Sequence, residues 1–135
     1  MPRVELLDAE TAPLSAQQYF LSGDPGPIVA ALATVRELLG PARGFVGPAL
    51  GAGAVGVRIK EFAILRTSAL QGCSYCINAH TTVSLDVGLT GHEVRALRGE
   101  TALEEAFVLA AERAMIGWID ALAGATGAIP DDVWA

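Results

Sequence analysis

The stretch VRIKEFAILRTSALQGCSYCINAH, residues 57–80, predicts two successive helices that meet at a glycine. Apolar residues recur with the helical period over residues 57–71, and Gly72 stands just past the end of that pattern, where helices favour glycine. A second helix then begins at the two cysteines. The expected buried face of the first helix comprises Ile59, Phe62, Ala63, Leu65 and Ala69.

Helical periodicity also dominates the rest of the chain, so we predict an all-α fold. Upstream, residues 27–39 read as an amphipathic helix that stops at Gly40-Pro41, and the glycine-rich residues 44–56 as weak or irregular helix. Downstream, Thr90 with Glu93 and Thr101 with Glu104 have capping-box spacing. The second box would open one long helix. The last residues, PDDVWA at 130–135, are expected to form a final turn.

The length and composition of the chain predict one domain over residues 1–135 that associates with copies of itself. Its 135 residues are 52% hydrophobic, which is enough for a core. Only 18% are charged, against roughly 25% in an average soluble domain. We therefore expect part of the apolar surface to be buried between subunits, in a homo-oligomer.

The charge of the chain excludes several classes of partner. A formal net charge of −6, with no cluster of lysine or arginine, disfavours nucleic acid and anionic lipid. The first residues, MPRVELLDAETAP, are acidic where a signal peptide would be basic, and no apolar stretch is long and uninterrupted enough to span a membrane. We expect a cytoplasmic protein that binds neither nucleic acid nor membrane.

Cys73, Cys76 and His80 lie within a sector of about 60° on an ideal helix. If the helix begins after Gly72, Cys73 is near its N-cap and Cys76 near position N3, where backbone N–H groups and the helix dipole stabilise a thiolate. His80, four residues after Cys76, can take the thiol proton. Cys76 is the expected attacking sulfur, and Cys73 can condense with its sulfenic acid to form a disulfide.

Two other interpretations of this cluster stay open on spacing alone. The thiols could be small apolar groups that fill a core while His80 bonds a carbonyl group. Zinc could bind Cys73, Cys76, His80 and a distant carboxylate, although a second ligand pair is missing from the sequence. Glu61, on the face of the first helix that leads to Gly72, could either be solvated or orient the imidazole of His80.

The motif KEFAILRTSALQGCSYCINAH, followed by GLTGHEV, resembles the alkylhydroperoxidase D-like branch of the carboxymuconolactone decarboxylase superfamily. The resemblance covers residues 57–97. It implies an all-α fold assembled as trimers or hexamers, with Glu61 and His80 as proton relay, Cys76 as peroxide-reactive thiol and Cys73 as resolving thiol. The best-known peroxidase members have a histidine before the second cysteine, whereas this chain has Tyr75, a phenol that is no base near neutral pH.

We therefore expect a thiol-dependent oxidoreductase that reduces hydroperoxides or disulfides and is reset by a dithiol or protein reductant, with no cofactor and no bound metal. One alternative is a non-catalytic or zinc-binding helical oligomer of the same superfamily. Another is a member that acts as a lactone decarboxylase.

Overall fold

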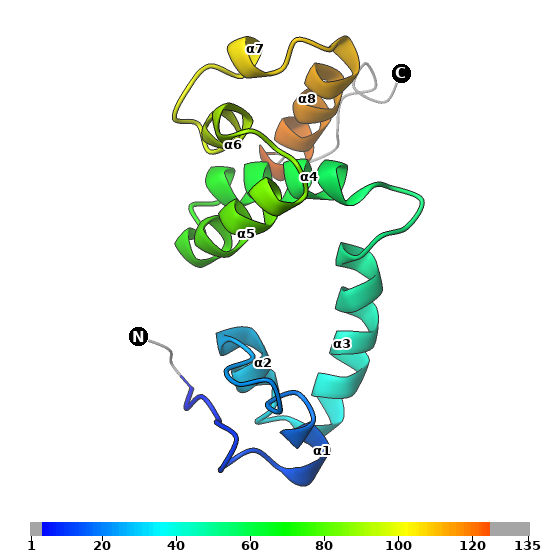
Figure 1. Cartoon of the computed structure of the whole chain (residues 1–135), viewed down its shortest axis with the longest axis vertical. Coiled ribbons are helices and arrows are strands. Elements are labelled where there is room, and N and C mark those ends of the chain that lie inside the picture. The colour runs from blue at the N-terminus through cyan, green and yellow to red at the C-terminus, as the bar shows by residue number, and fades with distance from the viewer. Residues whose placement is uncertain (1–3, 125–135) are drawn as a thin grey trace. The chain divides into compact units, whose positions relative to one another are not determined.

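A computed structural model of the chain describes residues 4–124, and every regular element in that range is a helix (Figure 1). The all-α prediction is confirmed. Contacts between Cα atoms divide the chain into two compact units, Met1–Gly51 and Ala52–Ala135. The single domain expected from length and composition stays a prediction.

The first unit contains three helices around a small core. They are α1 (Leu14–Gln17), α2 (Pro27–Leu32) and α3 (Arg36–Leu50), and both short helices pack against α3. The core is built mainly from small side chains with one phenylalanine: Ala12, Ala16, Phe20, Val29, Ala33 and Leu39. Arg43 of α3 stacks over the ring of Tyr19, with 5.8 Å from its guanidinium carbon to the ring centroid.

The helix predicted over residues 27–39 is wrong in both its continuity and its end. Helix α2 ends at Leu32, and α3 begins at Arg36 and continues through Pro41 and Pro48 to Leu50. Proline has no backbone N–H, so one carbonyl group in the preceding turn of the helix loses its hydrogen-bond donor. Pro41 is exposed, and water can bond to that carbonyl group instead. Residues 44–56 are accordingly helical only as far as Leu50.

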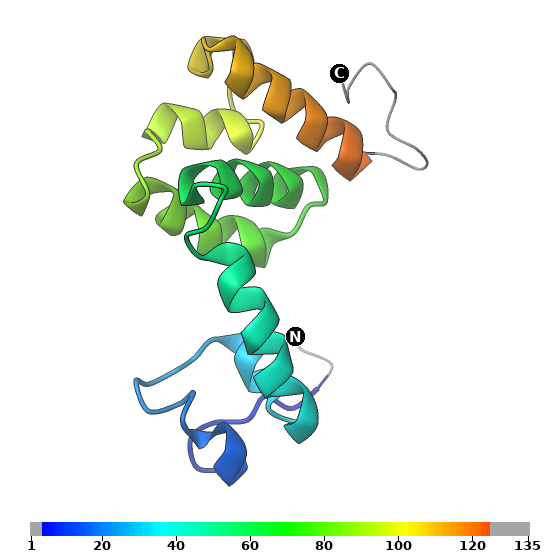
Figure 2. The same ribbon diagram turned by 90° about the vertical axis from the view of Figure 1, so that its right-hand side faces the viewer.

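The second unit places α4 at its centre. Helix α4 (Val57–Leu70) packs most extensively against α5 (Ser74–Asp86) and α8 (Ala110–Gly124), and also contacts α6 (Gly91–Leu97). The short α7 (Leu103–Ala106) packs on α6, and Figure 2 shows these layers from the side. The shared core comprises Phe62, Leu65, Leu89, Val94, Ala96, Leu97, Phe107, Ile116 and Ile119.

Glycine reverses the chain between α4 and α5, as the sequence predicts. Gly72 has φ +65°, a left-handed conformation that other residues adopt at a cost. Its N–H bonds to the carbonyl of Ala69 at 3.1 Å, and the N–H of Cys73 bonds to that of Ser68 at 2.9 Å. These two bonds are a Schellman motif, which satisfies the last carbonyls of α4 and starts α5 at the cysteines.

The two predicted capping boxes have different outcomes. Thr90 and Glu93 form both bonds of the box at the start of α6, so that prediction is confirmed. Thr101 caps nothing, and its hydroxyl oxygen is buried without a hydrogen-bond partner. The long helix predicted from this point is wrong, because the chain breaks between α7 and α8.

Phe107 accounts for the break after α7. Its side chain is fully buried and meets the ring of Phe62 edge to face, with 5.0 Å between centroids. Phe107 has an extended backbone, φ −116° and ψ 93°, which turns its ring into the core. Burying an aromatic ring gains more free energy than one continuous helix would add, so the core decides the backbone here.

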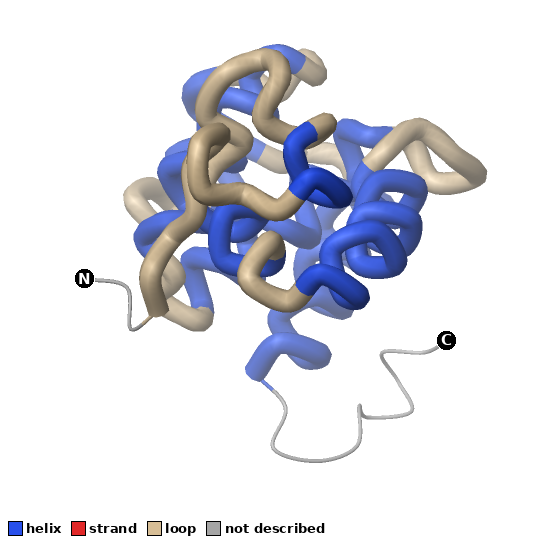
Figure 3. Tube along the Cα trace, turned by 90° about the horizontal axis from the view of Figure 1, so that it is seen from below, coloured by secondary structure: helices blue, strands red, loops and turns tan. Residues whose placement is uncertain are grey.

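Helices and connecting loops account for the whole described range, as Figure 3 shows by colour. Within that range, none of the helices combines the length and apolar character needed to cross a membrane. The final turn expected at residues 130–135 lies outside the described residues.

Candidate active site

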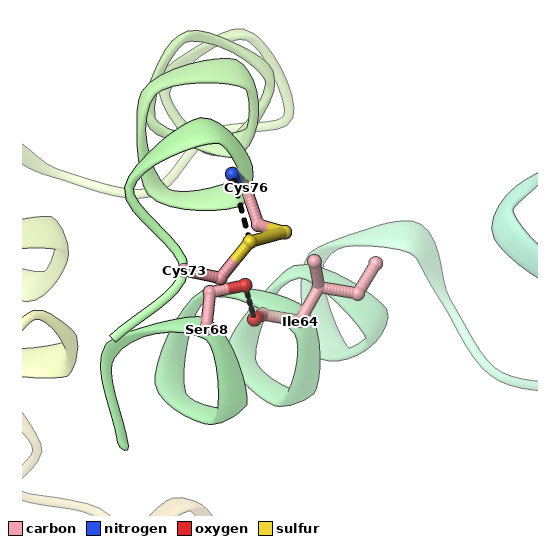
Figure 4. The surroundings of a disulfide bond; sticks show 4 residues. All are labelled: Ile64, Ser68, Cys73 and Cys76. Atoms are coloured by element: carbon pink, nitrogen blue, oxygen red, sulfur yellow. Dashed lines mark hydrogen bonds between the residues drawn. A yellow bond between two sulfur atoms is a disulfide. The ribbon is translucent and has the colours of Figure 1, made fainter. Parts of the chain in front are cut away.

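The two cysteines are joined as a disulfide at the start of α5 (Figure 4). Their Cα atoms are 5.3 Å apart, and both residues are half-buried. Cys73 is the N-cap of α5 and Cys76 its third residue, as the sequence predicts. The pair is therefore close enough to pass between a dithiol and a disulfide with the helix in place.

The backbone N–H of Cys76 points at the sulfur of Cys73, with 3.3 Å from N to Sγ. A cap residue accepts such a bond from position N3, and here the acceptor is sulfur in place of the usual oxygen. The bond, together with the positive end of the helix dipole, favours negative charge on Cys73 when the disulfide opens. The sequence predicts this stabilisation at the helix start that carries both cysteines, and the hydrogen bond from the Cys76 N–H falls on Cys73.

Helix α4 lies beside the disulfide with Ile64 and Ser68, as Figure 4 shows. Ser68 is buried, and its hydroxyl donates a hydrogen bond of 2.6 Å to the carbonyl of Ile64 one turn earlier. The disulfide is therefore bordered on this side by apolar carbon and by a hydroxyl that is already satisfied within its own helix.

Glu61 of α4 and His80 of α5 form the polar centre of the site. His80 Nδ1 lies 2.9 Å from Oε2 of Glu61 and 3.2 Å from Oε1. Glu61 is only 4% exposed, and Ser84 Oγ, one turn after His80, donates to Oε2 at 3.3 Å. Sequence analysis placed Glu61 on this side of its helix, and the packing of α4 on α5 brings it to His80.

These bonds determine the chemistry available to the imidazole of His80. A carboxylate accepts hydrogen bonds, so the hydrogen of a neutral imidazole is held on Nδ1 and the lone pair is left on Nε2. A base with its lone pair on Nε2 follows Cys76 by one helical turn. If it takes a proton, the charge of Glu61 lies directly beside the imidazolium.

Two further side chains extend this description. Arg66 of α4 is held by Asp120 of α8 through two bonds of 2.6 and 2.8 Å, and this hydrogen bonding raises the pKa of Arg66 above its usual value. Ser84 was not singled out by sequence reasoning, although its i+4 spacing from His80 is the signal that could have found it. In the described part of the chain, no group of three or more His, Cys, Asp or Glu side chains is arranged to hold a metal ion.

Comparison with protein families matches residues 42–121 to the model of the carboxymuconolactone decarboxylase family. The chain belongs to this family. The matched range contains both cysteines, Glu61 and His80, so the motif that carries the resemblance lies within the family's own domain. Comparisons of this carboxymuconolactone decarboxylase family member with curated proteins and with solved structures give no significant match.

Proposed function

We propose that the protein is a thiol-dependent oxidoreductase that cycles Cys73 and Cys76 between dithiol and disulfide while it reduces a hydroperoxide or a disulfide. The observation that carries the proposal is the cysteine pair at the start of α5 on the same helix as an imidazole bonded to a buried carboxylate. Such a pair needs a base, a resolving thiol and a reductant, and the chain supplies the first two.

The oxidising half of the cycle starts from the reduced protein. His80 removes the proton of Cys76, and the thiolate attacks an oxygen of the hydroperoxide, so that an S–O bond forms while the O–O bond breaks. The departing alkoxide takes the proton back from His80 and leaves as an alcohol. Cys73 then attacks the sulfenic sulfur of Cys76, and the disulfide forms as water leaves with the Cys73 proton.

The reducing half of the cycle needs an external dithiol or a protein thiol pair. Its thiolate attacks one sulfur of the disulfide, and a second thiolate completes the exchange, so both cysteines return to the thiol form and the reductant becomes a disulfide. The bond from the Cys76 N–H to Cys73 supports Cys73 as the leaving thiolate in this step, because a stabilised thiolate leaves faster. We place this cycle in the cytoplasm, where such reductants are maintained.

Glu61 and His80 form the proton relay of this proposal. The buried carboxylate holds the imidazole in one orientation and stabilises the cation that forms when His80 takes the thiol proton. Tyr75, which is exposed, supplies no second base next to Cys76. The cycle therefore depends on a single imidazole.

We also propose that the protein works as a homo-oligomer, a trimer or hexamer. An apolar groove of about 330 Å³ opens between α4 and α8, lined by Val55, Ile59, Lys60, Ala63, Met115, Trp118 and Ile119. In the first unit, Phe45 of α3 is 76% exposed. Apolar surfaces of this kind favour burial against another subunit. Light scattering coupled to size exclusion measures the subunit number, and a monomer at micromolar concentration contradicts this part of the proposal.

The test of the enzymatic proposal is the reaction of pre-reduced protein with an alkyl hydroperoxide. We expect one alcohol per cysteine pair, and continued turnover when dithiothreitol is added. Cys76→Ser should abolish alcohol formation, whereas Cys73→Ser should still release one alcohol and leave a sulfenic acid that dimedone traps. Full turnover by Cys76→Ser would refute the mechanism.

The same preparations decide between the proposal and its alternatives. Stoichiometric zinc in protein purified without added metal, with thiols that react only after chelation, would identify a zinc-binding oligomer. Release of carbon dioxide from a carboxylated lactone by the double Cys→Ser variant would identify a decarboxylase. Neither result is expected. Cysteines joined as a disulfide cannot bind zinc, and a decarboxylation that persists without both cysteines would leave the pair without a role.

A further inference from the structure

Ser84 is the buried polar side chain that the proposed cycle does not use. The buried polar residues of the described chain are Glu61, Ser68, Ser84 and Glu93. Glu93 serves the cap of α6 and pairs with Arg58, while Ser68 bonds within its own helix. Ser84 is 0% exposed and directs its hydroxyl at Glu61.

The hydroxyl of Ser84 bonds to Glu61 although a carbonyl group of its own helix is the usual acceptor for a helical serine. Serine and threonine in helices commonly donate to the carbonyl four residues back. Thr81 does so to Ile77 at 2.7 Å, and Ser68 does so to Ile64. Ser84 donates instead across the helix pair to Oε2 of Glu61, so its hydroxyl acts on the carboxylate.

The carboxylate of Glu61 therefore has two hydrogen-bond donors, and both come from one line on α5. His80 and Ser84 are four residues apart and face the same residue of α4. Cys76 lies four residues before His80 on that line. Helix α5 thus carries a sulfur, an imidazole and a hydroxyl in order, and Glu61 binds the last two.

We propose that Ser84 is a positioning residue that holds Glu61 as a hydrogen-bond acceptor and so keeps the imidazole hydrogen of His80 on Nδ1. This inference rests on the proposed function. Ser84 has one hydroxyl hydrogen and gives it to Oε2, which keeps that oxygen an acceptor. Glu61 then accepts the Nδ1–H of His80, and the Nε2 lone pair stays available for the proton of a thiol.

Among the described residues, loss of the Ser84 hydroxyl would leave His80 as the one side-chain donor to the carboxylate of Glu61. Oε2 would then lose the bond that fixes its direction, and the carboxylate could turn away from Nδ1. The Nδ1–H tautomer would lose part of its preference, and a larger share of neutral His80 would carry its hydrogen on Nε2. In that tautomer Nε2 has no lone pair for the thiol proton, so the oxidising step slows.

The first experiment measures single-turnover thiol loss of pre-reduced protein with an alkyl hydroperoxide. Ser84→Ala should slow this step about tenfold, the effect of one lost hydrogen bond to a charged group. Thr81→Val removes a hydroxyl from the same helix without touching Glu61 and should react at the wild-type rate. A wild-type rate for Ser84→Ala would overturn the proposal.

A double-mutant cycle separates positioning from a general effect on the fold. Ser84 acts through Glu61, so adding Ser84→Ala to Glu61→Gln should change the rate by less than about twofold. The same tenfold loss in both backgrounds would show that Ser84 affects the helix pair independently of the carboxylate, and would overturn the proposal.

The second experiment needs no turnover and so judges Ser84 separately from the proposed function. Protein labelled with ¹⁵N-histidine reports the tautomer of each imidazole at alkaline pH, and His92→Gln removes the other histidine signal. We expect the Nδ1–H form in wild type and a shift toward Nε2–H in Ser84→Ala. An unchanged tautomer ratio refutes the role of Ser84, whereas absent peroxide turnover with a shifted ratio refutes the proposed function alone.

Discussion

Arg58 holds three helices of the second unit together, and its removal should be strongly destabilising. The guanidinium of Arg58 on α4 bonds to Glu93 of α6 and, at 2.8 Å, to Glu112 of α8. It also lies 4.8 Å from the centroid of the Phe62 ring. The side chains of Glu93 and Glu112 are 11% and 16% exposed, whereas that of Arg58 is 34% exposed.

The magnitude follows from this partial burial. Removing one partner of a buried ion pair costs about 3–5 kcal/mol, and an exposed pair contributes about 0–1 kcal/mol. Because Arg58 is one-third exposed, we expect Arg58→Met to lower the free energy of unfolding by about 2–3 kcal/mol. For a unit of this size each kcal/mol corresponds to about 4–8 °C, so the Tm should fall by roughly 10–20 °C.

Thermal unfolding followed by circular dichroism measures this effect, with two matched variants. Arg98→Met breaks a more exposed pair with Glu100 in the same unit and should cost about 1 kcal/mol or less. In Arg58→Met the carboxylate of Glu93 has lost its ion-pair partner, and adding Glu93→Gln removes that charge. Glutamine can still form the capping box of α6, so the double variant should recover about half of the lost free energy of unfolding. Equal losses for Arg58→Met and Arg98→Met would refute the reasoning.

Three further predictions concern the site, the acid stability and a cap. Glu61→Gln removes the charge beside His80 and should slow single-turnover peroxide reduction by about 10–100-fold, with the dithiothreitol step unchanged; equal slowing of both steps would indicate a fold effect. Hydrogen bonds from Thr11 lower the pKa of Asp8 below its usual 3.8, so Asp8 stabilises the protein above about pH 4 and this contribution is lost as pH falls further. The Tm difference between wild type and Asp8→Asn should therefore shrink in acid, and a constant difference would contradict the assignment. Thr90→Ala should destabilise the protein by about 1 kcal/mol in urea unfolding, while Thr90→Ser should recover most of that loss.

Local backbone chemistry made much of the second unit predictable. Gly72 ends α4 and Cys73 caps α5 because a left-handed turn and a helix start depend on a few neighbouring residues. The Thr90 capping box is equally local. The shared face of the cysteines and His80 follows from their spacing on one helix.

The two wrong helix predictions have different physical reasons. Thr101 and Glu104 have the spacing of a cap, but the burial of Phe107 against Phe62 breaks the helix they would have opened. Propensity rules weigh each residue in its own segment and contain no term for this distant contact. In the first unit, Gly40-Pro41 predicts the end of a helix, yet α3 continues through the exposed Pro41, where water can satisfy the carbonyl that loses its partner.

By itself, the sequence determined the helical class, the start of α5 and the order of sulfur and imidazole along it, because these depend on the helical period and on local caps. Only the tertiary structure decided which acid meets His80 and that Ser84 meets the same acid. A serine in a helix can always bond to its own backbone, and its hydroxyl reaches a carboxylate only where another helix brings one within 3.3 Å. The distance between α4 and α5 is a property of the packed core, and no single segment encodes it.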